Sequence, residues 1–237
     1  MTCSLKKIHK MEIRPMHQPI RSIISIILRA RFSYLFFTII MLFTFRPLIE
    51  SLKAVTAATN IFVWFIVVSC VWAVHEKRKR QWFVISMAAT VILLDLLDFL
   101  LRSTVTLWAS KIAIFAFLGY AVVSILFYLA RQKEVTADML MAGASEYMLI
   151  GILWSWLYFL IETVHPGSFS IAGTKTDQFG FLYFSFVTLT TTGYGDVLPL
   201  SVQVRSLAIL EQITGQLFIA ITVARLVSLY TVGGRKQ

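Results

Sequence analysis

One stretch of nine residues carries the clearest chemistry in the sequence: Thr188-Leu189-Thr190-Thr191-Thr192-Gly193-Tyr194-Gly195-Asp196. Its two glycines flank the tyrosine, and glycine readily adopts the positive φ angles that let successive backbone carbonyls point the same way. A ring of such carbonyls, extended by a threonine hydroxyl, replaces the water shell of a dehydrated cation. The alternative is a polar turn between two apolar segments. The spacing favours a cation site built from backbone oxygens.

The stretch resembles the selectivity filter of potassium channels. The residues that carry the resemblance are Thr191, Thr192, Gly193, Tyr194 and Gly195, followed by the acidic residue Asp196. The resemblance implies that K⁺ binds at the first four of these residues, from Thr191 to Tyr194. Thr192 departs from the pattern, in which valine is usual, and we expect it to tune the filter without abolishing the preference for potassium.

The composition is that of a membrane protein. Of the 237 residues, 58% are hydrophobic, and the net charge is +10. The basic residues gather between apolar runs, which is typical of cytoplasmic loops and does not indicate nucleic-acid binding. Cys3 and Cys70 lie far apart in the sequence, so we expect neither a disulfide nor a metal site.

Six apolar segments are long enough to cross a membrane. A span needs about 20 apolar residues, and the candidates are 32–48, 55–74, 82–101, 104–130, 143–164 and 202–230. Residues 179–190 are apolar but too short to cross, which fits a re-entrant pore helix. We therefore expect an all-α membrane protein with a pore helix and filter between the fifth and sixth spans.

The distribution of Lys and Arg predicts the orientation. The amino-terminal cluster, residues 77–80, the pair Arg131 and Lys133, and the carboxy-terminal tail all fall on one side. That side is expected to be cytoplasmic, with both termini on it and the filter loop outside. The whole chain resembles bacterial six-span members of the ion-channel superfamily, and this resemblance implies the bacterial inner membrane.

Three regions follow: a cytoplasmic segment 1–31, a four-helix bundle 32–133, and a linker with the pore domain 134–237. The bundle occupies the place of a voltage sensor but lacks a ladder of arginines, since Lys111 is the single basic residue inside the fourth span. Asp95 and Asp98 share a face of the third span. We expect Lys111 to pair with one of them, because intramembrane charges usually pair, and we expect gating to depend weakly on voltage. Residues 134–148 form either an amphipathic coupling helix, capped by Thr136, or a plain connector.

The resemblance extends over residues 143–230 and implies further roles there. Tyr183 and Phe184 are expected to brace the filter tyrosine, with the Tyr183 hydroxyl bonding to Asp196. Val187 occupies a place that holds glutamate in some channels, so we expect no carboxyl pair with Asp196. Packing alone is the alternative for the two aromatic residues.

The sixth span contains a glycine and a carboxyl group. Gly215 has the spacing of a hinge glycine, although close helix packing would also account for it. The residues expected toward the inner cavity and gate are Gln216, Ile219, Ala220 and Val223. Glu211 lies in mid-span, where a carboxyl group is a functional candidate. It either bonds to a pore-helix threonine while protonated or pairs with Arg205.

One filter segment cannot close a ring of carbonyls, so we expect a homotetramer surrounded by lipid. The chain contains no catalytic constellation and no phosphate-binding loop, which predicts passive K⁺ conduction, no enzyme activity and no cofactor. The alternatives are a non-selective cation channel, a potassium-uptake transport subunit and a non-conducting relative. An uptake subunit is disfavoured by the single filter segment.

Overall fold

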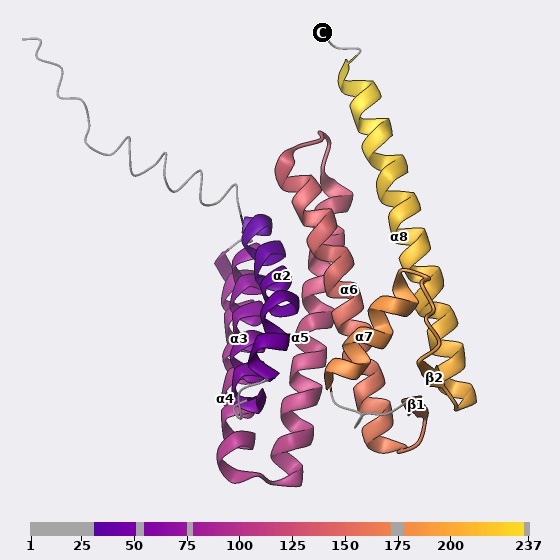
Figure 1. The fold of residues 1–237 in the computed structure, drawn as a ribbon. Helices are drawn as coiled ribbons and strands as arrows, with labels where there is room; N and C mark the ends of the chain where they lie inside the picture. Colours follow the sequence, from indigo (N-terminus) through magenta and orange to yellow (C-terminus); the bar gives the residue numbers. More distant parts are fainter. Residues whose placement is uncertain (1–30, 51–54, 75–77, 172–177, 235–237) are drawn as a thin grey trace, which may run out of the picture.

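A computed structural model describes residues 31–50, 55–74, 78–171 and 178–234 (Figure 1). The expected amino-terminal segment 1–31 therefore lies outside the described residues, except for Arg31. The helices are α2 (Arg31–Glu50), α3 (Val55–Ala73), α4 (Arg78–Leu101), α5 (Thr104–Arg131), α6 (Ala137–Val164), α7 (Gln178–Leu189) and α8 (Val202–Gly234).

Among the residues that the structure describes, four helices are long and apolar enough to cross a membrane: Arg80–Leu101, Thr104–Arg131, Ala137–Val164 and Val202–Thr231. Within the described residues α2 and α3 provide shorter apolar helices, Arg31–Phe45 and Val63–Ala73. The protein is thus a predominantly helical, multi-pass membrane protein. The expectation of six spans remains a prediction for the first two helices.

The helices form two groups (Figure 1). Helices α2 to α5 lie side by side as a bundle, and α6 separates this bundle from α8. The short helix α7 lies between α6 and α8 and packs closely on α6. The bundle also reaches α7 directly, since the rings of Phe43 and Phe186 meet edge to face at 5.0 Å. Aromatic and aliphatic side chains from both groups form one continuous apolar core.

The connection between α5 and α6 is tight. Helix α6 begins at Ala137, where Thr136 Oγ1 accepts a hydrogen bond from the Met139 backbone N–H at 3.2 Å. The predicted cap is therefore confirmed. No separate linker helix precedes the span, because α6 continues without interruption to Val164.

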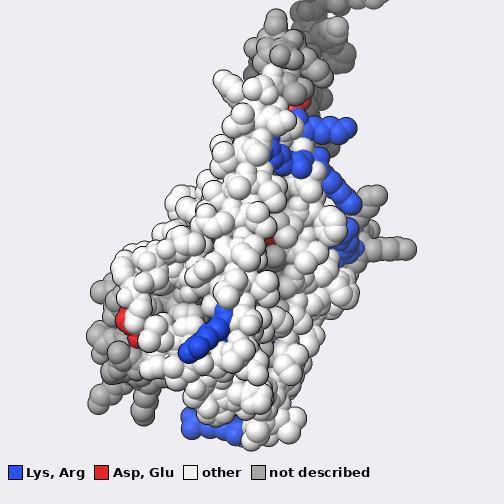
Figure 2. Space-filling view, turned by 90° about the vertical axis from the view of Figure 1, so that its right-hand side faces the viewer, with Lys and Arg blue, Asp and Glu red and all other residues white. Residues whose placement is uncertain are grey.

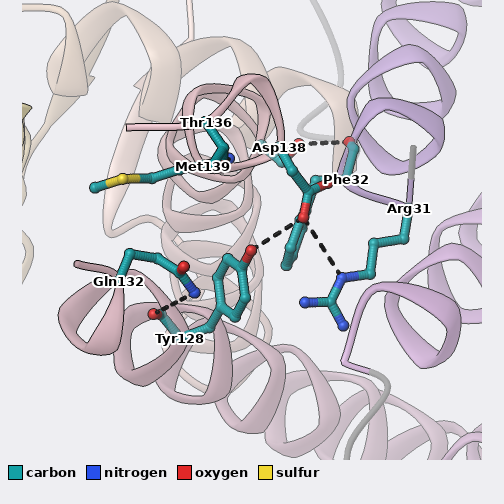
Figure 3. Close-up of polar contacts among 8 residues, drawn as sticks. Arg31, Phe32, Tyr128, Gln132, Thr136, Asp138 and Met139 are labelled. Carbon is teal, nitrogen blue, oxygen red and sulfur yellow. Dashed lines mark hydrogen bonds and ion pairs between the residues drawn. The ribbon is translucent and has the colours of Figure 1, made fainter. Parts of the chain in front are cut away.

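A polar cluster fixes this junction to the start of α2 (Figure 3). The Tyr128 hydroxyl donates to Asp138 Oδ2 at 3.0 Å, and Arg31 Nε lies 3.8 Å from the same oxygen. The Arg31 guanidinium also stacks over the Tyr128 ring, 4.8 Å from its centroid. Cation–π and ionic contacts thus join the ends of α2, α5 and α6.

Two short strands, not expected from the sequence, lie beside the expected filter segment. Strand β1 (Phe169–Ile171) pairs antiparallel with β2 (Val197–Pro199), and Ser170 faces Leu198. The all-α expectation needs this correction. Three residues are too few to display the alternation of apolar and polar residues that identifies a strand in a sequence.

The basic side chains concentrate at one end of the helices. Figure 2 shows most of the blue atoms near the end from which the carboxyl end of α8 projects. The described residues there include Arg31, Arg80, Arg131 and Lys133, whereas Arg102 and Arg205 lie near the opposite helix ends. This asymmetry agrees with the expected sidedness of the chain.

Candidate functional site: the filter segment and its supports

The backbone after α7 alternates in handedness. Thr191, Gly193 and Gly195 have φ angles of 57°, 60° and 81°, whereas the intervening Thr192 and Tyr194 have negative φ. Alternation of this kind turns successive carbonyl groups toward one side of the chain. The positive φ angles expected for the two glycines are confirmed. That of Thr191 was not foreseen, because a β-branched residue resists the left-handed region.

The amide groups of this segment point back to α7. The N–H groups of Thr191 and Thr192 donate to the carbonyls of Thr188 and Val187, each at 2.9 Å. The Gly193 N–H also donates to the Val187 carbonyl, at 3.3 Å. Amides bound in this way leave their own carbonyls available to an ion.

The side chain that departs from the potassium-channel pattern has a local partner. Thr192 Oγ1 lies 2.9 Å from Thr190 Oγ1, and Thr190 Oγ1 in turn donates to the Phe186 carbonyl at 2.6 Å. The hydroxyl of Thr192 is therefore engaged within the chain.

Tyr183 contacts the expected filter segment at Tyr194 and Asp196. Its hydroxyl donates to Asp196 Oδ2 at 2.7 Å, as expected, and its ring is parallel to that of Tyr194 within 5°, with centroids 6.4 Å apart. Asp196 Oδ1 accepts a second bond from the Val197 N–H at 3.1 Å. The hydrogen bond to Asp196, with a smaller contribution from partial desolvation, raises the pKa of Tyr183 to about 12.

Phe184 does not brace the filter tyrosine. Its ring is buried and contacts Tyr158 of α6 at 5.2 Å and Phe169 of β1 at 5.3 Å, both edge to face. The packing alternative is therefore correct for this residue. Val187 contributes through its backbone, since its carbonyl accepts the two amides described above.

A cavity of about 200 Å³ lies between the filter segment, α7, β2 and α8. Its lining includes Tyr183, Val187, Gly193, Asp196 and Gln212. The filter segment is thus separated from α8 by open space on a single chain.

Gly215 has a packing role. An added Cβ there would lie 2.5 Å from the Leu189 carbonyl oxygen and 2.9 Å from Leu189 Cδ1. Helix α8 therefore approaches the carboxyl end of α7 as closely as glycine permits. The helix is continuous through this position, so the hinge role remains a prediction.

The residues expected to line the cavity and gate, Gln216, Ile219, Ala220 and Val223, are all exposed on a single chain. The same helix exposes large apolar residues, among them Ile209, Leu217 and Val227, each more than half exposed. This surface is suited to lipid or to further copies of the chain.

Glu211 is fully buried between three helices. Its carboxyl group contacts the Tyr158 hydroxyl of α6 at 2.6 Å and the Ser185 hydroxyl of α7 at 2.5 Å. The partner on α7 is a serine, not the predicted threonine. The alternative pairing with Arg205 is wrong, because Arg205 Nε donates to the Pro199 carbonyl at 3.1 Å.

The charges of the bundle do not form the predicted ion pair. Trp64 Nε1 donates to Asp95 at 2.7 Å, and Thr106 Oγ1 donates to Asp98 at 3.3 Å. Lys111 Nζ instead lies over the Phe159 ring of α6, 4.4 Å from its centroid. In the described part of the chain no salt bridge joins Lys111 to either aspartate. Trp64 and Thr106 therefore bind the two aspartates as neutral donors, and Phe159 contacts Lys111 through the face of its ring.

A further contact, not foreseen from the sequence, joins α8 to the end of α5. Arg225 Nη2 donates to the carbonyls of Ala130 and Gln132, at 2.6 and 2.9 Å. The last turn of α5 carries partial negative charge on such carbonyls, which favours a cation there.

In comparisons with known proteins, part of the chain matches a family model. Residues 146–232, from α6 to α8, match the family model described as "Ion channel". This match supports ion-channel activity and favours a protein that is not an enzyme. Searches of curated proteins and of solved structures found no match to the chain.

Proposed function

We propose that the protein is a potassium-selective channel that conducts K⁺ passively through a homotetrameric pore. The observation that carries the proposal is the alternating backbone at Thr191, Gly193 and Gly195, whose amides bind α7. Carbonyls on one side of such a segment supply the rigid oxygens that replace the hydration shell of K⁺. The matched channel family gives the same segment its context.

The exposure of the filter supports an assembly of four chains. Residues 191–196 are all exposed on a single chain, and Tyr194 is 71% exposed. One such segment forms only part of a ring, so further copies must face it across a rotation axis. In this assembly the inner cavity is lined by Gln216, Ile219, Ala220 and Val223, and lipid surrounds the outer helices.

The contacts within the chain favour an assembly without domain swapping. Only residues 132–136 separate α5 from α6, which makes the two helices antiparallel neighbours. The bundle then lies against the pore helix of its own subunit, as the contact between Phe43 and Phe186 indicates. The filter opens on the side opposite the basic helix ends, and the proposed topology has six spans with cytoplasmic termini in a bacterial inner membrane.

A flux assay tests the proposal. Purified protein in liposomes loaded with KCl should release potassium when an ionophore provides a counterflow, and sodium-loaded liposomes should release little. G193A should abolish the flux, because alanine resists a φ of 60°. Equal potassium and sodium release would favour the non-selective cation channel. Absence of both fluxes from an assembled tetramer would favour the non-conducting relative.

A further inference from the structure

The carboxyl group of Glu211 belongs to a network of three short oxygen–oxygen contacts. The number of hydrogens that these contacts need can be compared with the number that the hydroxyl groups supply. Tyr158 Oη is 2.6 Å from Glu211 Oε2, and Ser185 Oγ is 2.5 Å from Glu211 Oε1. Ser185 Oγ is also 2.7 Å from the Gly151 carbonyl oxygen. All three distances are hydrogen-bonded distances between oxygen atoms, so each needs a hydrogen between the two oxygens.

The two hydroxyl groups supply only two of these hydrogens. The Gly151 carbonyl can only accept, so the single hydrogen of Ser185 is directed to it. Tyr158 directs its own hydrogen to Oε2. The hydrogen between Ser185 and Oε1 must then come from the carboxyl group itself.

We infer that Glu211 is a neutral carboxylic acid that donates to Ser185 and so positions the pore helix. Ser185 belongs to α7, Gly151 and Tyr158 to α6, and Glu211 to α8, so one proton completes a connection among three helices. Ser185 lies six residues before Thr191, where the alternating backbone begins. The network therefore attaches α7 to both α6 and α8 shortly before the filter segment begins.

The surroundings of Glu211 agree with a neutral group. The side chain is fully buried, and an uncompensated carboxylate in such a place is costly. Helix α6 faces it with the phenols of Tyr147 and Tyr158, and α7 carries Tyr183, whose hydroxyl is bound to Asp196. On α8 the nearest cation in sequence, Arg205, is bound to the Pro199 carbonyl. In the described chain no Lys or Arg forms an ion pair with Glu211.

Loss of the proton would leave two hydrogens for three contacts. Ser185 could then bind either Gly151 or Glu211 but not both, and α7 would lose one of the two bonds that Ser185 makes. The consequence is that one of the bonds anchoring the pore helix depends on a single titratable proton.

Infrared spectroscopy of the protein in lipid tests the protonation without any measurement of current. The wild type should show the C=O stretching band of a protonated carboxyl group, and E211Q should lose part of it. Glu146 is also fully buried, and neither of its carboxyl oxygens has a hydrogen-bond partner among the described residues. E146Q is therefore the matched control, and it should remove a different component. A protonated-carboxyl band that E211Q leaves unchanged would overturn the inference.

Substitution tests the positioning role. In E211Q the amide N–H₂ donates to Ser185 and the amide carbonyl accepts from Tyr158, which reproduces the neutral acid. E211Q should keep the thermal stability of the wild type, whereas E211L and S185A should both melt at lower temperature. Equal losses in E211Q and E211L would overturn the role of the neutral form.

The effect on conduction rests on the proposed function. Alkaline titration should reduce the wild-type flux in a single-proton transition that is absent from E211Q. A transition that persists unchanged in E211Q would contradict the inference, and the spectroscopic result would stand independently of any failure to conduct.

Discussion

The Tyr183 hydroxyl donates a 2.7 Å hydrogen bond to Asp196 Oδ2, joining the pore helix to the chain beyond the filter. The same ring lies parallel to that of Tyr194 between these two attachment points. A hydrogen bond to a carboxylate is stronger than one between neutral groups. This pair therefore limits how far the outer part of the filter can move.

Removal of the hydroxyl should loosen the filter. Y183F keeps the stacked ring but loses the bond, so we expect several-fold faster entry into an inactivated state in macroscopic current recordings. Y120F is the matched control, because the described structure records no hydrogen bond from the Tyr120 hydroxyl. Unchanged inactivation in Y183F would show that the ring alone supports the filter.

The same bond predicts a pH dependence of defined sign. The donor in this bond is the neutral phenol of Tyr183. The bond to Asp196 raises the pKa of that phenol from 10.0 to about 12. The stabilisation is therefore fully present below pH 10 and is lost as the pH rises through about 12. The difference in inactivation rate between wild type and Y183F should stay constant from neutral pH to pH 10. A difference that disappears near neutral pH would contradict this assignment.

Gly215 and Gly119 should respond oppositely to alanine. In G215A the new Cβ would meet the Leu189 carbonyl at 2.5 Å, and overpacking of this kind costs about 1–3 kcal/mol. In G119A the Cβ meets no atom within 4 Å, so the better helix propensity should stabilise by up to about 1 kcal/mol. Thermal unfolding of the two variants in detergent measures the contrast. Tolerance of G215A with full stability would favour the hinge role over the packing role.

Voltage should have little effect on opening. One charge that crosses the whole membrane potential gives about 2.3 kcal/mol per 100 mV. Lys111 is the basic residue inside α5, and its contact with Phe159 holds it against α6. The conductance–voltage relation should be shallow and nearly the same in K111Q. A steep relation that K111Q abolishes would identify a moving sensor.

Arg225 should couple the inner helix to the bundle. Its two bonds to the end of α5 are charge-assisted, and such bonds contribute about 1.5–3 kcal/mol. R225Q should lower the unfolding temperature and change the open probability. K133Q removes the same charge from an exposed position beside the junction and should do neither. Equal effects of the two substitutions would reduce the role of Arg225 to net charge.

The sequence predicted the helices closely because their signal is local. Long apolar runs predict α4, α5 and α8 to within four residues, whereas α6 begins at Ala137, six residues before the predicted span, at the cap on Thr136. Gly193 and Gly195 likewise indicated the positive φ angles that the backbone adopts at these positions. The positive φ of Thr191 could not be predicted, since it follows from amide bonds to α7 that only the folded chain provides.

The sequence predicted the partners of the charged residues within the helices poorly. The cost of unpaired charges in a membrane favoured an ion pair for Lys111, yet Asp95 binds Trp64 and Lys111 lies over the Phe159 ring. Glu211 met a serine and a tyrosine from helices far away in sequence. A residue list gives the types of possible partners but not which helix faces bring them together.

The most direct test of the central claim is the reversal potential of the purified protein in a planar bilayer with potassium on one side and sodium on the other. A filter built from the carbonyls of residues 191–195 predicts a potential far from zero, with the sign set by the potassium gradient. A reversal potential near zero, with robust currents from an intact tetramer, would contradict potassium selectivity.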